Sequence, residues 1–302
     1  MTEINYSVII PHKNIPTLLQ HCIDSIPRRD DVQIIVVDDN SDPEKVDFDN
    51  FPGKDDPHVE LYFTKEGKGA GYARNVGLEH AKGKWLLFAD ADDYFLEDLN
   101  RLMNDYLNSH SDIIFLYNKT VDLHKGFFLN IDQPVAIKYM KCNSSINDYD
   151  ALRFECYPPW TKMVRRQLVN SHNVTFDQVK ASNDVFFSVK VGYYAKNVEI
   201  CPYVIYMRVV RQDSLQYSYS EEGLLDRIKV GYNVNEFLNS INMIKHYAPI
   251  ASYILQLRKK NIFLFLKHLF LFFVKSPRYI LKDSFLKVFK RWFASDLRYC
   301  LM

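Results

Sequence analysis

The sequence lacks the features that mark secreted, disulfide-rich and membrane-spanning proteins. Its five cysteines are far apart, odd in number and form no C-x-x-C pair, which argues against a disulfide framework and against a zinc site. The polar N-terminus passes directly into an apolar stretch that is too short for a signal peptide. The apolar run at 261–274 is interrupted by Lys267 and His268, and it is shorter than the roughly 20 residues of a spanning helix. We therefore expect a protein of the reducing cytoplasm.

The chain also has no excess of one charge, with 38 Lys and Arg against 37 Asp and Glu, but its charge is unevenly distributed. Residues 255–302 contain 11 basic and two acidic residues, and the rest of the chain is mildly acidic. A basic, aromatic tail predicts one or two amphipathic helices on an anionic membrane, here the inner face of the plasma membrane. The alternative is that these helices pack on the catalytic domain or on a second copy in a homodimer. No nucleic-acid partner is expected.

The first third of the chain alternates short apolar, β-branched runs with helical patterns, which predicts a parallel α/β sheet. Strands are expected at 7–10, 33–37, 59–63 and 85–88. A helix is expected between the first two, with Asn14 as its cap, Pro16 in its first turn and Pro27 closing it. A second helix is expected at 71–82, stopped by Gly83. Ligands of such sheets bind beyond the carboxyl ends of the strands, so the polar residues there are the candidate site.

The acidic run from Asp90 to Asp93 follows the fourth expected strand. Alternate carboxylates at a strand end can share Mg²⁺ or Mn²⁺, which prefer oxygen ligands and commonly complete their shell with substrate phosphates. Such a metal would neutralise charge on a departing diphosphate. An acidic turn or a helix cap is the alternative, because Asp is favoured at both.

Two further groups of residues suit a nucleotide. Asp38 and Asp39 follow the second expected strand, where a carboxylate can accept a hydrogen bond from a base N–H, although turn formation is an equal alternative. The segment from Gly69 to Arg74 leads into a helix, and its glycines would let the backbone approach phosphate while Arg74 supplies donors. The segment lacks the third small residue of a dinucleotide fingerprint, and the chain has no P-loop motif.

In order and spacing, four segments resemble the donor half of family-2 glycosyltransferases of the GT-A fold. They are SVIIP at 7–11, IIVVDDNS at 34–41, ARNVG at 73–77 and FADADD at 88–93. The resemblance implies a Rossmann-like, mixed and mostly parallel sheet flanked by helices, with a helical, basic C-terminal extension. It further implies a catalytic domain at 1–218, with a nucleotide-sugar half at 1–95 and an acceptor half at 96–218. The helical region would follow at 219–302.

The resemblance also assigns roles in the donor half. Asp39 would bind the base, Asp38 would support its loop, and Pro11 would lie in the strand-to-helix turn over the nucleotide. Arg74 would approach the diphosphate. In the acidic run, Asp92 would ligate Mn²⁺ or Mg²⁺ directly, Asp90 would contact the ribose or a metal-bound water, and Ala91 would lie against the donor between them; Asp93 would cap the next segment or reach the sugar.

The second half matches the family more loosely. Asp184 would be the general base that removes a proton from the acceptor hydroxyl, and Asn183 stands where many relatives have Glu. Arg208 and Arg211 would clamp the leaving diphosphate, with a role as ordinary surface residues as the alternative. A direct displacement needs one base and no enzyme nucleophile, which agrees with a single carboxylate at this position.

The predicted function is therefore an inverting transfer from a nucleotide-sugar, expected to be a UDP-sugar, in cell-surface polysaccharide synthesis. The acceptor would be a glycan or a lipid-linked saccharide. A nucleotidyltransferase of related fold is a weaker alternative, because the turn after the first strand contains no glycine. A non-catalytic, membrane-peripheral binding protein is a third reading, but it would require broken donor motifs.

Overall fold

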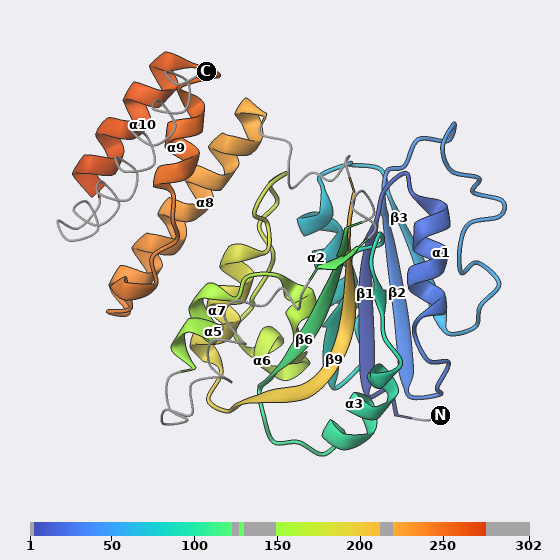
Figure 1. Ribbon diagram of the computed structural model, residues 1–302. Helices are drawn as coiled ribbons and strands as arrows, with labels where there is room; N and C mark the ends of the chain where they lie inside the picture. Colours follow the sequence, from blue (N-terminus) through green and yellow to red (C-terminus); the bar gives the residue numbers. More distant parts are fainter. Residues whose placement is uncertain (1–2, 123–126, 130–148, 212–219, 276–302) are drawn as a thin grey trace. The chain divides into compact units, whose positions relative to one another are not determined.

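The computed structural model describes residues 3–122, 127–129, 149–211 and 220–275 (Figure 1). The chain divides into two compact units, Met1–Ser214 and Leu215–Met302. The first unit contains a mixed β-sheet with helices on both faces, and the second unit is helical in its described residues.

Four parallel strands form the first part of the sheet. They are β1 (Tyr6–His12), β2 (Val32–Asp39), β3 (Val59–Thr64) and β4 (Trp85–Phe88), which confirms the four strands expected from the sequence. All residues of β1, β2 and β4 are buried, and this explains their continuous apolar runs. The strands β1 and β2 end side by side, and β4 ends slightly earlier, at the level of Ile9, so the residues that follow β2 and β4 meet at one edge of the sheet.

The second part of the sheet is mixed. The strand order is β3-β2-β1-β4-β8-β6-β9-β5, with β7 (Phe127–Leu129) paired to β6. The short strand β8 (Lys162–Arg165) runs antiparallel between β4 and β6 (Ile113–Asp122), and β6 is parallel to the long β9 (Val198–Val210). The two-residue strand β5 (Tyr94–Phe95) is antiparallel to β9. This mixed, mostly parallel sheet confirms the expected fold class.

Helices cover both faces of the sheet and bury separate apolar clusters. On one face lie α1 (Pro16–Asp24) and α3 (Asp98–Tyr106), whose buried residues include Leu19, Ile23 and Leu102. The other face is covered by four helices: α2 (Ala70–His80), α5 (Asp150–Glu155), α6 (Arg166–Ser171) and α7 (Val185–Tyr194). Each contributes a buried residue to the core on this face, namely Ala73, Leu152, Leu168 and Phe187 in the same order. The single-turn helix η1 (Pro159–Thr161) precedes β8.

Two local expectations were wrong. Asn14 does not cap α1; its φ is 60°, its side-chain oxygen accepts from the Asp42 amide at 2.7 Å, and it thereby joins the loops after β1 and β2. The helix α2 ends at His80, and Gly83 does not stop it. A Cβ at Gly83 would lie 2.5 Å from the amide nitrogen of Ser7, so glycine is required there for close packing on β1.

The second unit has its own apolar core. It consists of α8 (Glu221–Ser240), η3 (Ile244–His246), α9 (Ala251–Leu257) and α10 (Ile262–Lys275), with residues such as Leu224, Ile254 and Phe272 between them. Ser220 caps α8 by accepting a hydrogen bond from the Gly223 amide at 3.1 Å. None of the helices in the described ranges combines the length and the apolar character needed to cross a membrane.

Candidate active site

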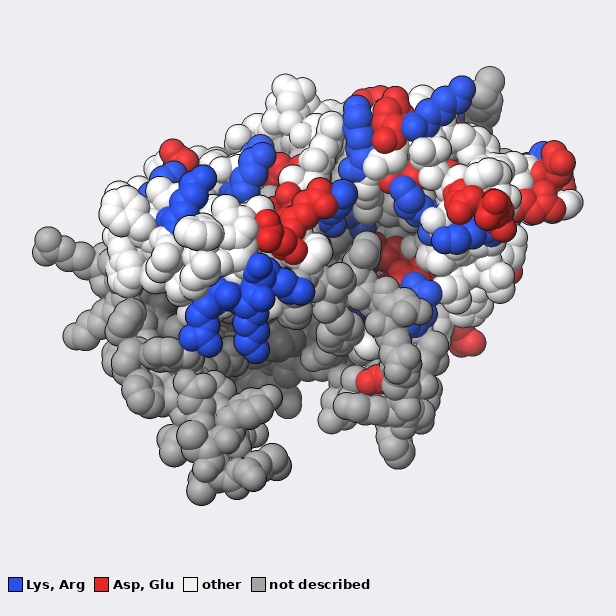
Figure 2. All heavy atoms as spheres, turned by 90° about the horizontal axis from the view of Figure 1, so that it is seen from above, with Lys and Arg blue, Asp and Glu red and all other residues white. Residues whose placement is uncertain are grey.

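Arg74 links the acidic run to the segment before α7. Its guanidinium donates to the Asp90 carboxylate at 2.5 Å and to the side-chain oxygen of Asn183 at 2.8 Å. The arginine is only 5% exposed because it lies in the second turn of α2, which packs on the sheet. Residues 74, 90 and 183, far apart in sequence, therefore meet at the carboxyl edge. Seen from above, the described acidic side chains lie next to Lys and Arg side chains (Figure 2).

A second arginine pairs with Asp92, which is the next outward-facing carboxylate. Arg211 donates to one oxygen of Asp92 at 2.6 Å. Burial raises the pKa of Asp90; the charge of Arg74 opposes this increase and the charge of Asp92 adds to it, with Arg208 opposing more weakly. Two carboxylates are thus held near one another by the arginines around them.

These two carboxylates fit a hard divalent cation. Each binds an arginine through one oxygen, Asp90 through Oδ1 and Asp92 through Oδ2, so within the described residues the other oxygen of each carboxylate remains for a ligand. Over the described ranges, no group of three or more His, Cys, Asp and Glu side chains is placed to hold a metal ion. Mg²⁺ and Mn²⁺ are commonly held by one or two carboxylates together with substrate phosphates, so the donor set suits a metal that arrives with a diphosphate.

Asp93, expected to cap the next segment or to reach the sugar, is instead directed into the protein towards β9. It is 4% exposed, accepts from the Val209 amide at 2.7 Å and accepts from the Tyr206 hydroxyl at 3.0 Å. The same hydroxyl accepts from the Asp90 amide at 2.9 Å, and the Tyr206 ring stacks on Trp160. Burial raises the pKa of Asp93 well above its usual value, and the charges of Asp90 and Asp92 raise it further. Asp93 and Tyr206 therefore fix the acidic run to β9.

Asp184 immediately precedes α7, next to the Asn183 that binds Arg74. Its side chain is half-buried and does not cap the helix through a hydrogen bond. Burial raises the pKa of Asp184, while the positive charges of Arg74 and Lys162 oppose this change. A carboxylate with a raised pKa is a better proton acceptor than an ordinary surface aspartate, which suits a general base.

Asp38 is a structural residue behind the edge. It is 1% exposed and accepts from Ser41 through both the amide at 2.9 Å and the hydroxyl at 2.5 Å. His12 contacts it at 2.7 Å through Nδ1, and Nε2 of His12 accepts from the Ile15 amide, so the proton lies on Nδ1. Burial alone would raise the pKa of Asp38, but these hydrogen bonds outweigh it and the pKa lies below its usual range.

Asp39 has one occupied and one free oxygen. Oδ2 accepts from the Gly69 amide at 2.8 Å, and the ammonium of Lys13 lies 3.6 Å from it. Oδ1 is buried and has no hydrogen-bond partner within the described part of the chain. Gly69 has a φ of 92°, which explains glycine at this position. The free oxygen is available to a donor from a ligand.

Two predicted donor contacts differ from the expected geometry. Pro11 is buried inside β1, paired with Val37, and does not lie in the turn that follows. A proline is accommodated in this central strand because pairing with β4 ends at Ile9, before the missing N–H would be needed. Ala91 has its side chain in the apolar core, so it can offer a donor only its backbone.

Lys162 lies in the segment 160–166, part of the looser resemblance to the family, but the sequence assigns it no role in the site. It is 2% exposed, and its ammonium donates to the carbonyls of Cys156 at 2.7 Å and Pro158 at 3.1 Å and to the Ser188 hydroxyl at 3.0 Å. It thereby fastens the segment before Trp160 to the first turn of α7, close behind Asp184. The available signal was an isolated Lys in an apolar segment, which also fits an ordinary surface residue.

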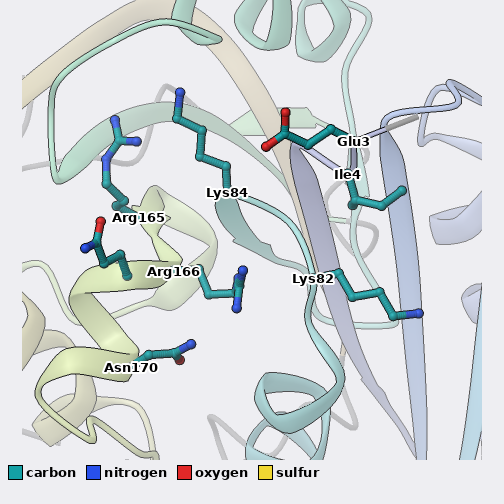
Figure 3. Close-up of a pocket in the computed structure, with 8 residues that line it drawn as sticks. Glu3, Ile4, Lys82, Lys84, Arg165, Arg166 and Asn170 are labelled. Carbon is teal, nitrogen blue, oxygen red and sulfur yellow. The ribbon is translucent and has the colours of Figure 1, made fainter. Parts of the chain in front are cut away.

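A separate basic pocket of about 520 Å³ lies at the opposite edge, where β1 and β4 begin (Figure 3). Its cationic lining residues are Lys82, Lys84, Arg165 and Arg166. Their partners include the Glu60 carboxylate and main-chain carbonyls such as those of Leu107 and Gly83. None of the predicted site residues lines this pocket, so the candidate active site lies elsewhere.

Comparison with known proteins agrees with this arrangement. Residues 7–172 match the family described as Glycosyl transferase family 2, and the chain belongs to that family. It is 24% identical to the putative glycosyltransferase EpsH of Bacillus subtilis over 80% of this chain and 71% of EpsH. It is 28% identical to a poly(ribitol-phosphate) beta-glucosyltransferase of Bacillus spizizenii over 68% of this chain, but it spans only 32% of that protein.

Among solved structures, the fold resembles that of residues 1–349 of S. aureus TarS in complex with UDP-GlcNAc. The TM-score is 0.65 at 21% identity, covering 83% of this chain and 72% of the TarS chain. This likeness supports the GT-A fold. With the family match, it identifies the protein as a glycosyltransferase.

Proposed function

We propose that the protein transfers a sugar, with inversion, from a UDP-sugar to a glycan or lipid-linked saccharide in cell-surface polysaccharide synthesis. The choice of nucleotide rests on Oδ1 of Asp39, which is buried and has no hydrogen-bond partner among the described residues. Uracil presents one N–H between two carbonyls, and a single free carboxylate oxygen matches that edge. Guanine presents two adjacent donors, but the second oxygen of Asp39 is already taken by Gly69.

The acidic run and its arginines supply the rest of the donor site. Asp92, with Asp90 beside it, would hold Mn²⁺ or Mg²⁺, and the metal would neutralise the diphosphate as the leaving group. Arg74 and Arg211 contact these carboxylates, and the charge of Arg208 acts on Asp90, which supports this assignment. Guanidinium groups at this position would stabilise the negative charge that develops on UDP.

Asp184 is proposed as the base. It would take the proton of the acceptor hydroxyl, whose oxygen attacks the anomeric carbon while the bond to the diphosphate breaks. The electron pair of that bond leaves with UDP, and the configuration inverts because the attack comes from the opposite face. Arg74 and Lys162 oppose the effect of burial on the Asp184 pKa, which keeps an ionised base accessible.

A nucleotide panel tests the donor assignment. UDP with Mn²⁺ should raise the melting temperature more than GDP or ADP, and Asp39→Asn should weaken UDP binding about tenfold, the expected loss for a hydrogen bond to a charged group. Asp49→Asn is the matched control, because Asp49 is exposed on the loop after β2. Equal stabilisation by GDP would refute the choice of base, and no response to any nucleotide would refute the donor site.

The α10 helix supports a proposed peripheral association with an anionic membrane at the cytoplasmic face. Its outward side exposes Phe263 (81%), Phe270 (68%) and Val274 (65%), and basic residues at 258–260, 267 and 275 flank this apolar stripe. An apolar stripe bordered by cations matches the interface of an anionic leaflet. The opposite side of α10, including Phe272, packs in the core of the second unit.

Vesicle sedimentation tests this association with the full chain. Binding should require anionic phosphatidylglycerol, and Phe263→Ser combined with Phe270→Ser should reduce it. Phe48→Ser is the control, because Phe48 is 38% exposed in the catalytic unit. If the double variant instead converts a dimer to a monomer without altering vesicle binding, a second copy covers the stripe and the membrane proposal is wrong.

A further inference from the structure

Strand β6 carries buried polar groups that nothing in the described chain satisfies. Both the nitrogen and the oxygen of the Asn118 amide, and the Thr120 hydroxyl, lack a hydrogen-bond partner, although each residue is only 1% exposed. Buried polar groups are normally paired, since an unsatisfied group costs roughly 1–3 kcal/mol. Two such residues two positions apart therefore indicate a missing partner, namely a ligand or bound water.

The two residues lie at the same edge of the sheet as the acidic run. Leu86 of β4 and Ile113 of β6 both pair with Val164 of β8, so they are at one level of the sheet. Both strands run in the same direction from that level, because β8 is antiparallel to each. Further along this direction, Asn118 pairs with Tyr206, whose hydroxyl accepts from the Asp90 amide at 2.9 Å, so Asn118 lies towards the edge that carries the acidic run.

They also face the side of the sheet to which the acidic run is attached. Tyr206 belongs to the same core cluster as Leu116, and Asn118 pairs with Tyr206, so Asn118 and, two residues further on, Thr120 face that side. Across the ladder, Asn118 pairs with Tyr206 and Thr120 pairs with Arg208. The Tyr206 hydroxyl binds Asp93 and the Asp90 amide, and the charge of Arg208 acts on Asp90. Asn118 and Thr120 are thus one strand away from the donor-site contacts.

We infer that Asn118 and Thr120 bind hydroxyl groups of a saccharide in the active site, as residues that determine sugar specificity. The inference rests on the proposed glycosyl transfer. An amide offers a donor and an acceptor, and a threonine hydroxyl offers both functions, which matches a pair of neighbouring sugar hydroxyls. Neither side chain is charged, so a neutral sugar suits them better than the diphosphate. The sugar of the donor and the sugar of the acceptor share this chemistry.

Asn118→Leu and Thr120→Val remove the polar groups at nearly constant size. Each should raise KM for one sugar substrate about tenfold, because a site built for a hydroxyl loses its partner. Hydrolysis of the UDP-sugar without acceptor reports the donor contact, and KM for the acceptor reports the acceptor contact. UDP affinity should stay unchanged, and the melting temperature should stay the same or rise because an unsatisfied buried group has been removed.

Two controls separate this role from a structural one. Thr120→Ser keeps the hydroxyl and should keep KM, whereas Leu116→Val, on the same face of β6, should lower the melting temperature without changing KM. If both KM values stay at the wild-type level in Asn118→Leu and Thr120→Val while UDP still binds, the groups hold only water and the inference is wrong. Absence of UDP binding in the wild type would instead refute the proposed function, and this inference with it.

Discussion

A guanidinium nitrogen of Arg211 lies 2.6 Å from a carboxylate oxygen of Asp92, so the proposed metal ligand already has a cationic partner. Arg74 holds Asp90 in the same way at 2.5 Å. Two opposite charges at these distances attract strongly when partly buried, and a metal ion on the other oxygen of Asp92 would compete with Arg211 for the charge of this carboxylate. Arg211, held less tightly by Asp92, would then be able to contact the diphosphate.

Replacing Arg211 with Gln should therefore have two opposite effects. The affinity for Mn²⁺ alone, measured by calorimetry, should increase because the competing cation is gone. The value of kcat should fall about 10- to 1,000-fold, because the transition state loses a charged donor. Arg101→Gln provides a control, since Arg101 is exposed and forms an ion pair with Asp105 on α3. Unchanged Mn²⁺ affinity would show that the two cations do not compete.

Asp184→Asn should abolish transfer and leave UDP binding intact. A general base contributes roughly 10²- to 10⁴-fold to the rate, so kcat should fall by that order. In the wild type the base must be ionised to accept a proton, and burial raises the pKa of Asp184 above the value of about 3.9 that is usual for Asp. Activity should therefore fall as the pH drops through this raised pKa. Loss of UDP affinity in the variant, measured by calorimetry, would place Asp184 in the donor site instead.

Asp93→Asn should make stability less dependent on pH. The pKa of Asp93 is raised in the folded protein, so the native state keeps a proton that the unfolded chain has released. The free energy of unfolding therefore decreases as pH rises from the unfolded pKa towards the folded one. Urea denaturation at a series of pH values should show a shallower decline in the variant than in the wild type and in Asp49→Asn. Parallel curves would contradict this account.

The sequence predicts the first four strands well because the pattern that identifies each strand lies within its own residues. Runs such as 33–37 are apolar and β-branched throughout, and this pattern occurs in strands buried on both faces. The sequence does not predict the short strand β8, because four residues are too few to show a periodic pattern. Its place between β4 and β6 depends on residues that are distant in the sequence. The turn at Asn14 fits both a cap and a left-handed residue, and contacts with Ser41 and Asp42 decide between them.

The sequence predicts which residues belong to the candidate site better than it predicts the contacts between them. The motifs locate Arg74, Asp90 and Asp92, since carboxylates and guanidinium groups at strand ends are chemically specific. The bond between Arg74 and Asn183 joins residues 109 positions apart, and the bond between Tyr206 and Asp93 joins residues 113 positions apart. Such pairs depend on how the second half of the sheet folds back on the first, which no local pattern encodes.

Gly71 is one residue whose predicted role the structure revises, and it supports a last prediction. A Cβ at this position would lie 2.1 Å from the Asp177 carbonyl oxygen and 2.9 Å from Cβ of Asn183. The glycine thus makes room for the protein's own backbone, beside the loop that delivers Asn183 to Arg74. Gly71→Ala should cost roughly 1–3 kcal/mol by overpacking, measured by urea denaturation.

The same substitution should weaken UDP binding, because moving α2 away from this loop separates Arg74 from Asn183. Glu79→Ala, an exposed change on the same helix, should leave both stability and UDP affinity close to the wild-type values. A loss of stability with unchanged UDP affinity would show that the contact between Arg74 and Asn183 does not position the donor site. Unchanged stability would mean that the loop at Asp177 can move away without cost.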